Sequence, residues 1–387
     1  MTLDDQRLAD GGMLTASDTG MLAATVGAGS ELRRAVADTD PALVALIAAA
    51  GRPRAILVAG AGGSSAAGDV LAACAGVGSP IPVVLTGGPG LPGWVGSLDL
   101  VVAISGSGTS EETLSLAEEA GRRGSQVVGI TPPGPLADRV ARARGVHLML
   151  RPPTTSVRAR ALLWRMAAPL LLLGQSLDVV DGGQEIFDEA ADVLDDVALT
   201  GGPGVPLGNN AAKDLALVLA ESLPLIWGTP GVGAAAARRF GRQLAENAGL
   251  PSSAGALPEA VRTHARVLAG TWSDPDDQDL FRDRVAEPVD RGRPHLVLLA
   301  DEAADPLSRR LAAAAADIAV SHGIPVTRRT AGTGHPLVRF AELVAELDLA
   351  SVYAGIAHGI DPAGTAASLD PRLDRQDLDH RGQQEVG

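Results

Sequence analysis

A run of small hydroxyl residues and glycines at positions 105–110 is the stretch of this chain best suited to chemistry. It reads Ser-Gly-Ser-Gly-Thr-Ser and lies between an apolar run at 98–104 and a helix-forming sequence at 111–117. Hydroxyls and the free amides of a helix N-terminus donate hydrogen bonds to phosphate, and the helix dipole favours its negative charge. The run therefore predicts a site for a phosphate or sugar phosphate. The alternative is an ordinary polar turn with an N-cap serine.

A second glycine-rich turn, at 60–69, follows another apolar run at 54–59. Its sequence, Gly-Ala-Gly-Gly-Ser-Ser-Ala-Ala-Gly-Asp, lacks the spacing of the G-x-G-x-x-G dinucleotide fingerprint. No acidic residue ends the next predicted strand, at 82–85, where a ribose would need one. The turn therefore disfavours a nicotinamide-dependent dehydrogenase.

The elements that must position these turns alternate between strands and helices. After helices in residues 1–50, strands are predicted at 54–59, 82–85, 98–104 and 126–131, with an edge element at 145–155. The alternation repeats in the second half of the chain, where we predict strands at 223–228, 294–301 and 324–327 and helices at 233–249 and 337–357. This alternation is typical of βαβ units. We therefore predict an α/β fold with two domains, 1–200 and 201–370, each a parallel sheet between helices (a three-layer α/β/α sandwich), and a tail at 371–387.

The composition limits the classes of partner. The chain has 387 residues, a net charge of −14 and 46% hydrophobic residues. Its negative charge disfavours electrostatic binding to nucleic acid or to an anionic membrane. A single cysteine, Cys74, excludes an intrachain disulfide and a cysteine-based metal site. The N-terminus lacks a secretory pattern and no apolar run approaches about 18 residues, so a cytoplasmic location is expected.

The two turns together resemble the sugar isomerase (SIS) domain family. Residues 105–112 are similar to its Ser-x-Ser-Gly-x-Thr-x-Glu loop, with a serine in place of the threonine. Within that family, the chain most resembles the bifunctional phosphoglucose/phosphomannose isomerases, which have segments similar to residues 60–69, 239–248 and 359–362. It implies two SIS-type domains and an isomerase that interconverts glucose 6-phosphate and/or mannose 6-phosphate with fructose 6-phosphate through a cis-enediolate. It also implies a homodimer with a shared active site and no metal or redox cofactor.

The resemblance also implies roles for individual residues. Glu246 would move the proton between C1 and C2, His264 would assist ring opening, and Arg158 would stabilise the enediolate. The substrate and its phosphate would be bound by the glycines and hydroxyls of the two turns: Gly62, Gly63, Ser64, Ser105, Ser107, Thr109 and Ser110. From the residues alone, Glu246 shares a helix face with Arg239 and Gln243, which is also typical of a solvated polar face.

The chain departs from the family at two catalytic positions. Aligned without a gap, Arg262 takes the place of the family's histidine, and His264 lies two residues later. The family's C-terminal lysine is missing, and Arg372 is the nearest cation. These differences leave open a second function, that of a catalytically impaired sugar-phosphate sensor or regulatory protein of the same fold.

Overall fold

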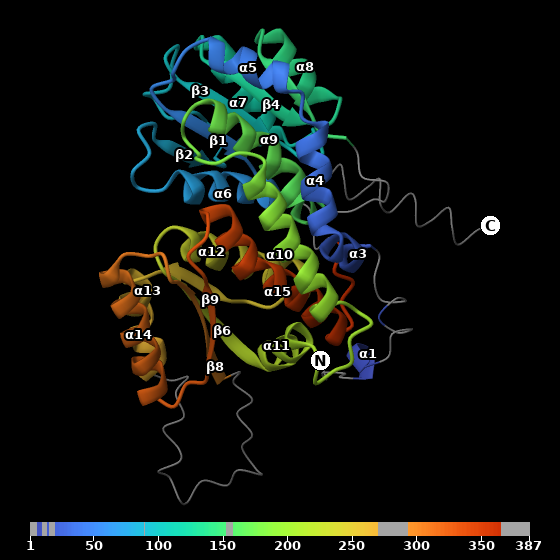
Figure 1. The fold of residues 1–387 in the computed structure, drawn as a ribbon, viewed down its shortest axis with the longest axis vertical. Coiled ribbons are helices and arrows are strands. Elements are labelled where there is room, and N and C mark those ends of the chain that lie inside the picture. The colour runs from blue at the N-terminus through green and yellow to red at the C-terminus, as the bar shows by residue number, and fades with distance from the viewer. Residues whose placement is uncertain are drawn as a thin grey trace, which may run out of the picture.

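Two parallel β-sheets organise the chain, one in each half (Figure 1). The computed structural model describes residues 6–9, 14, 20–88, 90–151, 158–269 and 293–364. The first sheet has the order β2-β1-β3-β4-β5 and the second β7-β6-β8-β9, and every neighbouring pair is parallel. The strands are β1 (Ile56–Gly60), β2 (Val83–Thr86), β3 (Leu100–Ile104), β4 (Gln126–Thr131), β5 (Val146–Met149), β6 (Ser222–Gly228), β7 (Ser253–Ala256), β8 (Arg293–Asp301) and β9 (Val326–Ala331). The predicted α/β class, with a parallel sheet in each half, is confirmed.

Helices cover both faces of the first sheet. Ile56 and Val58 of β1 face a core that includes residues of α6 (Ser65–Ala75) and α9 (Leu163–Ser176). Leu57, between them, faces the opposite core, with α7 (Glu111–Arg122) and α8 (Pro135–Arg142). Because side chains alternate along a strand, a central strand covered on both faces is apolar at successive positions. This is why residues 54–59 and 98–104 form apolar runs.

The second sheet has the same three-layer arrangement. Ile226 of β6 faces the side that carries α11 (Ala211–Ala220), α12 (Val232–Ala248) and α15 (Pro336–Ala357). Its neighbours Leu225 and Trp227 face the side of α13 (Glu259–Ala269) and α14 (Pro306–Ser321). The edge strand β7 and the helices α13 and α14 were not among the predicted elements. The sequence of β7, Ser-Ala-Gly-Ala, has neither the β-branched residues nor the aromatic residues that indicate a strand.

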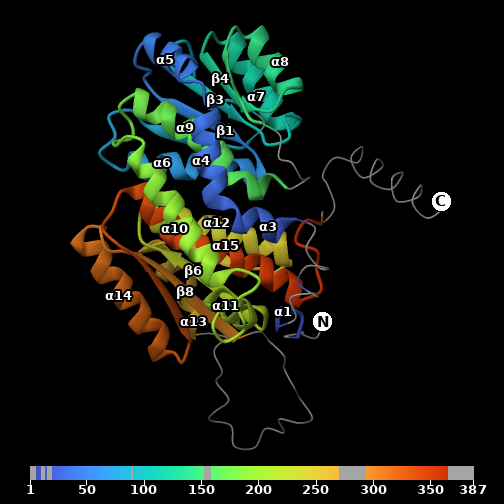
Figure 2. The same ribbon diagram turned by 45° about the vertical axis from the view of Figure 1, so that its right-hand side comes forward.

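One continuous hydrophobic core joins the two halves. It runs from the α6 and α9 face of the first sheet to the α12 and α15 face of the second. Figures 1 and 2 both show α6 lying against α12, with α10 (Glu185–Gly201) running alongside α15 and α4 (Ala28–Asp38). The shorter helices α1 (Gln6–Ala9), α3 (Met21–Val26) and α5 (Pro41–Ala49) complete the N-terminal segment. The core thereby sets α12 against the first half.

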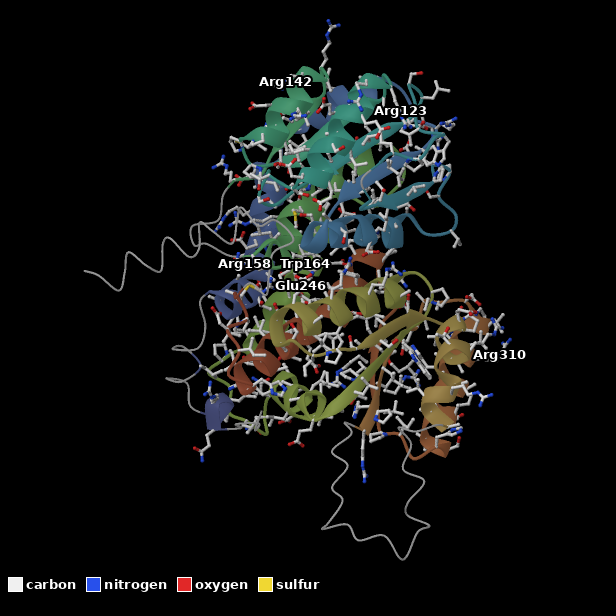
Figure 3. The ribbon with its side chains drawn as sticks, turned by 180° about the vertical axis from the view of Figure 1, so that it is seen from behind. Arg123, Arg142, Arg158, Trp164, Glu246 and Arg310 are labelled. Atoms are coloured by element: carbon white, nitrogen blue, oxygen red, sulfur yellow. The ribbon has the colours of Figure 1, made fainter. Side chains whose placement is uncertain are left out.

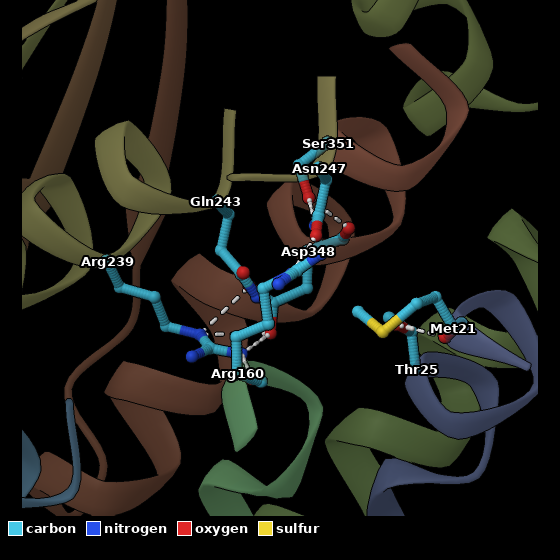
Figure 4. A network of polar contacts seen from close by, with 8 residues as sticks. All are labelled: Met21, Thr25, Arg160, Arg239, Gln243, Asn247, Asp348 and Ser351. Carbon is cyan, nitrogen blue, oxygen red and sulfur yellow. Dashed lines mark hydrogen bonds and ion pairs between the residues drawn. The ribbon is translucent and has the colours of Figure 1, made fainter. Parts of the chain in front are cut away.

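Two buried polar contacts fix the position of α12 along the apolar helix α15 (Figure 4). Arg239 Nη2 donates to Asp348 Oδ2 at 2.6 Å, and Asn247 Nδ2 donates to Ser351 Oγ at 2.9 Å. Removing one partner of a buried ion pair costs roughly 3–5 kcal/mol, because it leaves an uncompensated charge. These contacts therefore resist sliding of α12 along α15.

No helix in the described part of the chain, α15 included, is long and apolar enough to cross a membrane.

Candidate active site

The two predicted turns meet at the carboxyl edge of the first sheet. They follow β1 and β3, which are neighbours, and the chain continues from them toward opposite sides of the sheet. Open α/β sheets bind ligands at such a switch point. A direct contact joins the turns, since Gly106 N donates to Ser64 Oγ at 3.2 Å. The structure thus brings together the residues at which the sequence predicted phosphate binding.

The hydroxyls of the 105–110 turn divide into two groups. Ser105 is buried, and its Oγ accepts a hydrogen bond from Gly108 N at 3.0 Å. Ser110 caps the first turn of α7 through its side chain. Ser107 and Thr109 are exposed, with 3.1 Å between Thr109 Oγ1 and Ser107 Oγ. The first pair maintains the shape of the turn, and the second pair presents hydroxyls to the surroundings.

The turn after β1 needs glycine for two different reasons. Gly62 has a φ of 53°, in the left-handed region that glycine adopts without strain. Gly63 packs against the segment that precedes α9, and a Cβ on it would lie only 2.5 Å from the amide nitrogen of Arg160. Gly106 of the second turn is similarly close, since a Cβ on it would lie 3.1 Å from the Cβ of Ala159. Residues 159–160 therefore lie against both turns.

Glu246 lies in the last turn of α12 and faces a largely buried arginine. Its carboxylate is 35% exposed, and its Oε2 is 3.7 Å from Nη1 of Arg160, whose side chain is 10% exposed. Arg160 Nε donates to Asn247 Oδ1 at 2.6 Å, and its Nη2 donates to the carbonyl of Pro362. Burial lowers the pKa of Arg160 and the charge of Glu246 raises it. The guanidinium stays a cation at neutral pH.

Arg158 lies on the same segment but has a different partner. Its Nε donates to the carbonyl of Ala363 at 2.6 Å, and Figure 3 shows it with Glu246 at the junction of the two halves. The residue paired with Glu246 is Arg160, which the family pattern did not single out. The repeated Arg-Ala pair at 158–161 was the available indication, because Arg160 is followed by alanine just as Arg158 is. The loop 152–157 and Arg372 lie outside the described residues.

Asn247 links the α12–α15 contact to the Arg160–Glu246 pair. It is fully buried, and its amide accepts from Arg160 Nε while donating to Ser351 Oγ. Because the amide of Asn247 is held from the other side, it fixes the orientation of the guanidinium (Figure 4). Arg239 and Gln243, earlier on the same helix, contact Asp348 instead.

Replacing Asn247 with alanine should lower the stability of the protein and release Arg160 from its anchor. The change leaves a buried guanidinium N–H without its acceptor, which costs roughly 1–3 kcal/mol of stability. Because the guanidinium is then free to move, the isomerisation of fructose 6-phosphate that the family resemblance implies should have a kcat about tenfold lower. Ser351→Ala is the graded comparison, since it removes the hydrogen bond that holds Asn247 but keeps the contact of Asn247 with Arg160, so its effect should be smaller. An unchanged kcat in Asn247→Ala would show that Arg160 needs no such anchor.

Within one chain, the structure does not bring His264 to Glu246. The imidazole is buried on the α13 side of the second sheet, where it stacks on Trp227, whereas α12 covers the opposite side. Trp227 Nε1 donates to His264 Nδ1 at 2.7 Å, and Nε2 lies 2.6 Å from Ser253 Oγ. Since an indole only donates, we infer that the proton is on Nε2. Arg262 is exposed and pairs with Glu259. Ring opening by His264 stays a prediction.

Acid should destabilise the protein through four histidines that are buried or partly buried. Burial lowers the pKa of His264 from its ordinary 6.5, and does the same for His295, His335 and His358. As pH falls below 6.5, the unfolded chain binds protons that the folded chain does not, so the free energy of unfolding decreases. We expect a lower urea midpoint at about pH 5.5 than at about pH 7.5.

Replacing His264 with glutamine removes the titrating ring but keeps both of its hydrogen bonds. Its amide offers one acceptor to Trp227 and one donor to Ser253, but it does not titrate. We expect His264→Gln to reduce the pH dependence of the midpoint. An equal pH dependence in wild type and His264→Gln would contradict a neutral, buried His264.

Comparison with protein families and curated proteins agrees with this arrangement. Residues 52–173 match the SIS domain, and residues 208–368 match the bacterial phospho-glucose isomerase C-terminal SIS domain. Bifunctional phosphoglucose/phosphomannose isomerase of Caldicellulosiruptor bescii is 33% identical over 197 residues, 51% of this chain and 57% of that protein. The enzyme of the same name from Aquifex aeolicus is 30% identical over 191 residues, 49% of this chain and 53% of that protein. The chain thus spans little more than half the length of these curated relatives.

Solved structures share the fold at lower sequence identity. A candidate phosphosugar isomerase from Silicibacter pomeroyi DSS-3 has a TM-score of 0.60 and 21% identity, covering 89% of this chain and 99% of that one. The C-terminal domain of glucosamine-fructose-6-phosphate aminotransferase from Francisella tularensis has a TM-score of 0.59 and 15% identity, covering 88% and 95%. At these identities the similarity concerns the fold alone.

Proposed function

Because the chain belongs to the SIS-domain bifunctional phosphoglucose/phosphomannose isomerase family, we propose that it is an aldose–ketose isomerase. Its substrates would be glucose 6-phosphate and/or mannose 6-phosphate, with fructose 6-phosphate as the ketose. The observation that carries the proposal is the Glu246–Arg160 pair, placed beside two turns rich in hydroxyls and glycine. Such an isomerase needs a base, a fixed positive charge and a phosphate anchor.

The proposed mechanism assigns these three tasks to described residues. Ser107 and Thr109 donate hydrogen bonds to the phosphate from a turn held in shape by Ser105. The carboxylate of Glu246 removes the proton from C2 of the aldose, and the C–H electron pair forms the enediolate. Arg160 stabilises the negative charge that develops on its oxygens. The hydroxyl proton moves from O2 to O1 and Glu246 returns the carbon-bound proton to C1, which completes the ketose with no net change in protons.

Three finer features of the proposal follow from the family resemblance alone. They are a homodimer, with the ring-opening group supplied across its interface, activity without a metal ion, and a cytoplasmic location. The role of Arg158 at the enediolate likewise stays a prediction. Dimerisation is measured by sedimentation velocity of the purified chain, and metal independence by turnover in excess EDTA.

Deuterium exchange tests the proposal even where net conversion is slow. Fructose 6-phosphate is incubated with the purified chain in D2O, in the presence of EDTA, and the products are followed by proton NMR. We expect glucose 6-phosphate and/or mannose 6-phosphate to form with deuterium at C2, because the proton passes through a carboxylate that exchanges with solvent. Fructose 6-phosphate that binds, as measured by calorimetry, but neither reacts nor exchanges would overturn the isomerase.

A second candidate function is favoured by the surroundings of His264. Both of its ring nitrogens are engaged inside the second half of the chain, and the family's histidine position holds Arg262. A chain without a ring-opening group would bind the sugar phosphate without converting it, as a sensor does. Binding without turnover in the experiment above would support this function.

A further inference from the structure

A pocket lies on the other side of β1 from the proposed active site. It has a volume of about 430 Å³ and opens at the carboxyl ends of β1 and β2, where α12 of the second half approaches. Its wall combines the turn at 60–62, the hydroxyl residue Thr86 and Gly87 with the apolar side chains of Val58 and Leu85. The volume is within the range of small-molecule sites.

Two arginines from α12 line this pocket and are held by one carboxylate. Arg238 Nε donates to Asp69 Oδ1 at 2.9 Å, and Arg242 Nη2 donates to Asp69 Oδ2 at 2.6 Å. Asp69 is 5% exposed, whereas the side chains of Arg238 and Arg242 are 47% and 36% exposed. The cluster therefore carries two positive charges against one negative charge, in a chain whose net charge is −14.

The guanidinium groups keep hydrogen-bonding capacity on their exposed side. A guanidinium has five N–H groups. Arg238 directs two of its nitrogens at Asp69, and Arg242 uses one for Asp69 and one for Ser65 Oγ, at 2.5 Å. The remaining N–H groups have no acceptor among the residues that the structure describes. Because Asp69 fixes one edge of each guanidinium, the other edge is oriented before a ligand arrives, which lowers the entropic cost of binding.

We propose that this pocket binds a phosphate monoester, with Arg238 and Arg242 as its anion-binding residues. Planar guanidinium groups suit phosphate oxygens because they donate two parallel hydrogen bonds. The apolar wall of Val58 and Leu85 gives the organic part of the ester a surface to contact. A hexose phosphate and a nucleoside monophosphate share this chemistry, and the experiment distinguishes them.

The pocket and the proposed active site share one turn. Ser65, which accepts from Arg242, donates through its own Oγ to the carbonyl of Gly62 at 2.8 Å. Ser64, which precedes Ser65, contacts the 105–110 turn. A ligand that draws Arg242 away from Ser65 removes a hydrogen bond that holds the turn at 60–69 in place. By linkage, a hexose phosphate at the active site would then change the affinity of the pocket by the same factor.

The test measures phosphate-ester binding when the active-site turn is disabled. The full chain carrying Ser105→Ala and Ser107→Ala is titrated by calorimetry with fructose 6-phosphate, AMP and inorganic phosphate in turn. We expect at least one ester to bind more tightly than inorganic phosphate, and the tighter of the two esters identifies the class. Arg238→Gln or Arg242→Gln in this background should weaken that binding at least tenfold. Arg262→Gln, which removes the same charge from an exposed position on α13, should leave it unchanged.

A third variant fills the pocket without touching the ion pairs. Gly87 has no positive φ, and a Cβ on it would meet only the carbonyl oxygen of Gly60, at an ordinary 3.4 Å. We therefore expect Gly87→Leu to keep the thermal midpoint and lose the ester. The proposal is overturned if no ester binds the serine variant, if inorganic phosphate binds equally well, or if Arg262→Gln loses as much affinity. These readouts are independent of turnover, so they stand apart from the test of the isomerase.

Discussion

Glutamine in place of Glu246 should lower the kcat for fructose 6-phosphate by about 10³-fold, because the amide cannot accept the proton that the carboxylate removes in the proposed mechanism. This corresponds to roughly 4 kcal/mol of transition-state stabilisation. The side chain keeps its size and its place in the last turn of α12, so the fold and the phosphate-binding turns are expected to stay intact. Calorimetry with fructose 6-phosphate should therefore give a Kd within a few-fold of wild type.

The control for this variant is another carboxylate of the second half that lies away from the site. Glu259 is exposed on α13, where it pairs with Arg262, and Glu259→Gln should leave kcat unchanged. Turnover close to wild type in Glu246→Gln would remove Glu246 as the base. Loss of both binding and turnover would instead indicate that Glu246 holds the substrate rather than transferring its proton.

Arg160 and Arg158 should differ sharply in their effect on catalysis. Replacing Arg160 with glutamine removes the fixed charge next to Glu246, and we expect kcat to fall by about 10²–10³-fold. Replacing Arg158 removes a cation whose hydrogen bond goes to the carbonyl of Ala363, and we expect less than a tenfold fall in kcat. Initial rates at saturating fructose 6-phosphate separate the two, since kcat reports the step after binding.

A lysine at each position completes this comparison. Lysine keeps the charge but loses the planar fork that binds Asn247 and Glu246 together, so Arg160→Lys should recover only part of the lost activity. Arg158→Lys should be close to wild type. A larger effect at Arg158 than at Arg160 would return the enediolate role to Arg158, as the family pattern alone had implied.

Those parts of the site that depend on local chemistry could be predicted from the sequence. The 105–110 and 60–69 turns could be located because an apolar strand, glycines and hydroxyl residues follow one another within about a dozen positions, as they do in phosphate-binding turns. The α/β class followed in the same way from alternating apolar runs. The strand β7 could not be predicted, since small residues at its four positions carry no strand preference and its pairing with β6 decides its conformation.

Long-range pairing accounts for the features that could not be predicted. Arg160 and Arg158 have the same local context, and only the approach of α12 distinguishes them. The burial of His264 depends likewise on a contact with Trp227, 37 residues earlier in the chain. The Arg238 and Arg242 pair resembles any polar helix face until α6 supplies Asp69, 169 residues away from Arg238. Residue types at a helical spacing do not reveal which element will face them.

The carbonyls that hold the two arginines come from almost the last described residues of the chain. Pro362 and Ala363 are 202 and 205 positions beyond the arginines that they contact. The strands of both sheets end by Ala331, so the elements that carry the two turns all precede, along the chain, the segment that holds the arginines. Arg158 and Arg160 reach their final contacts only when residues 362–363 fold back onto the first half of the chain.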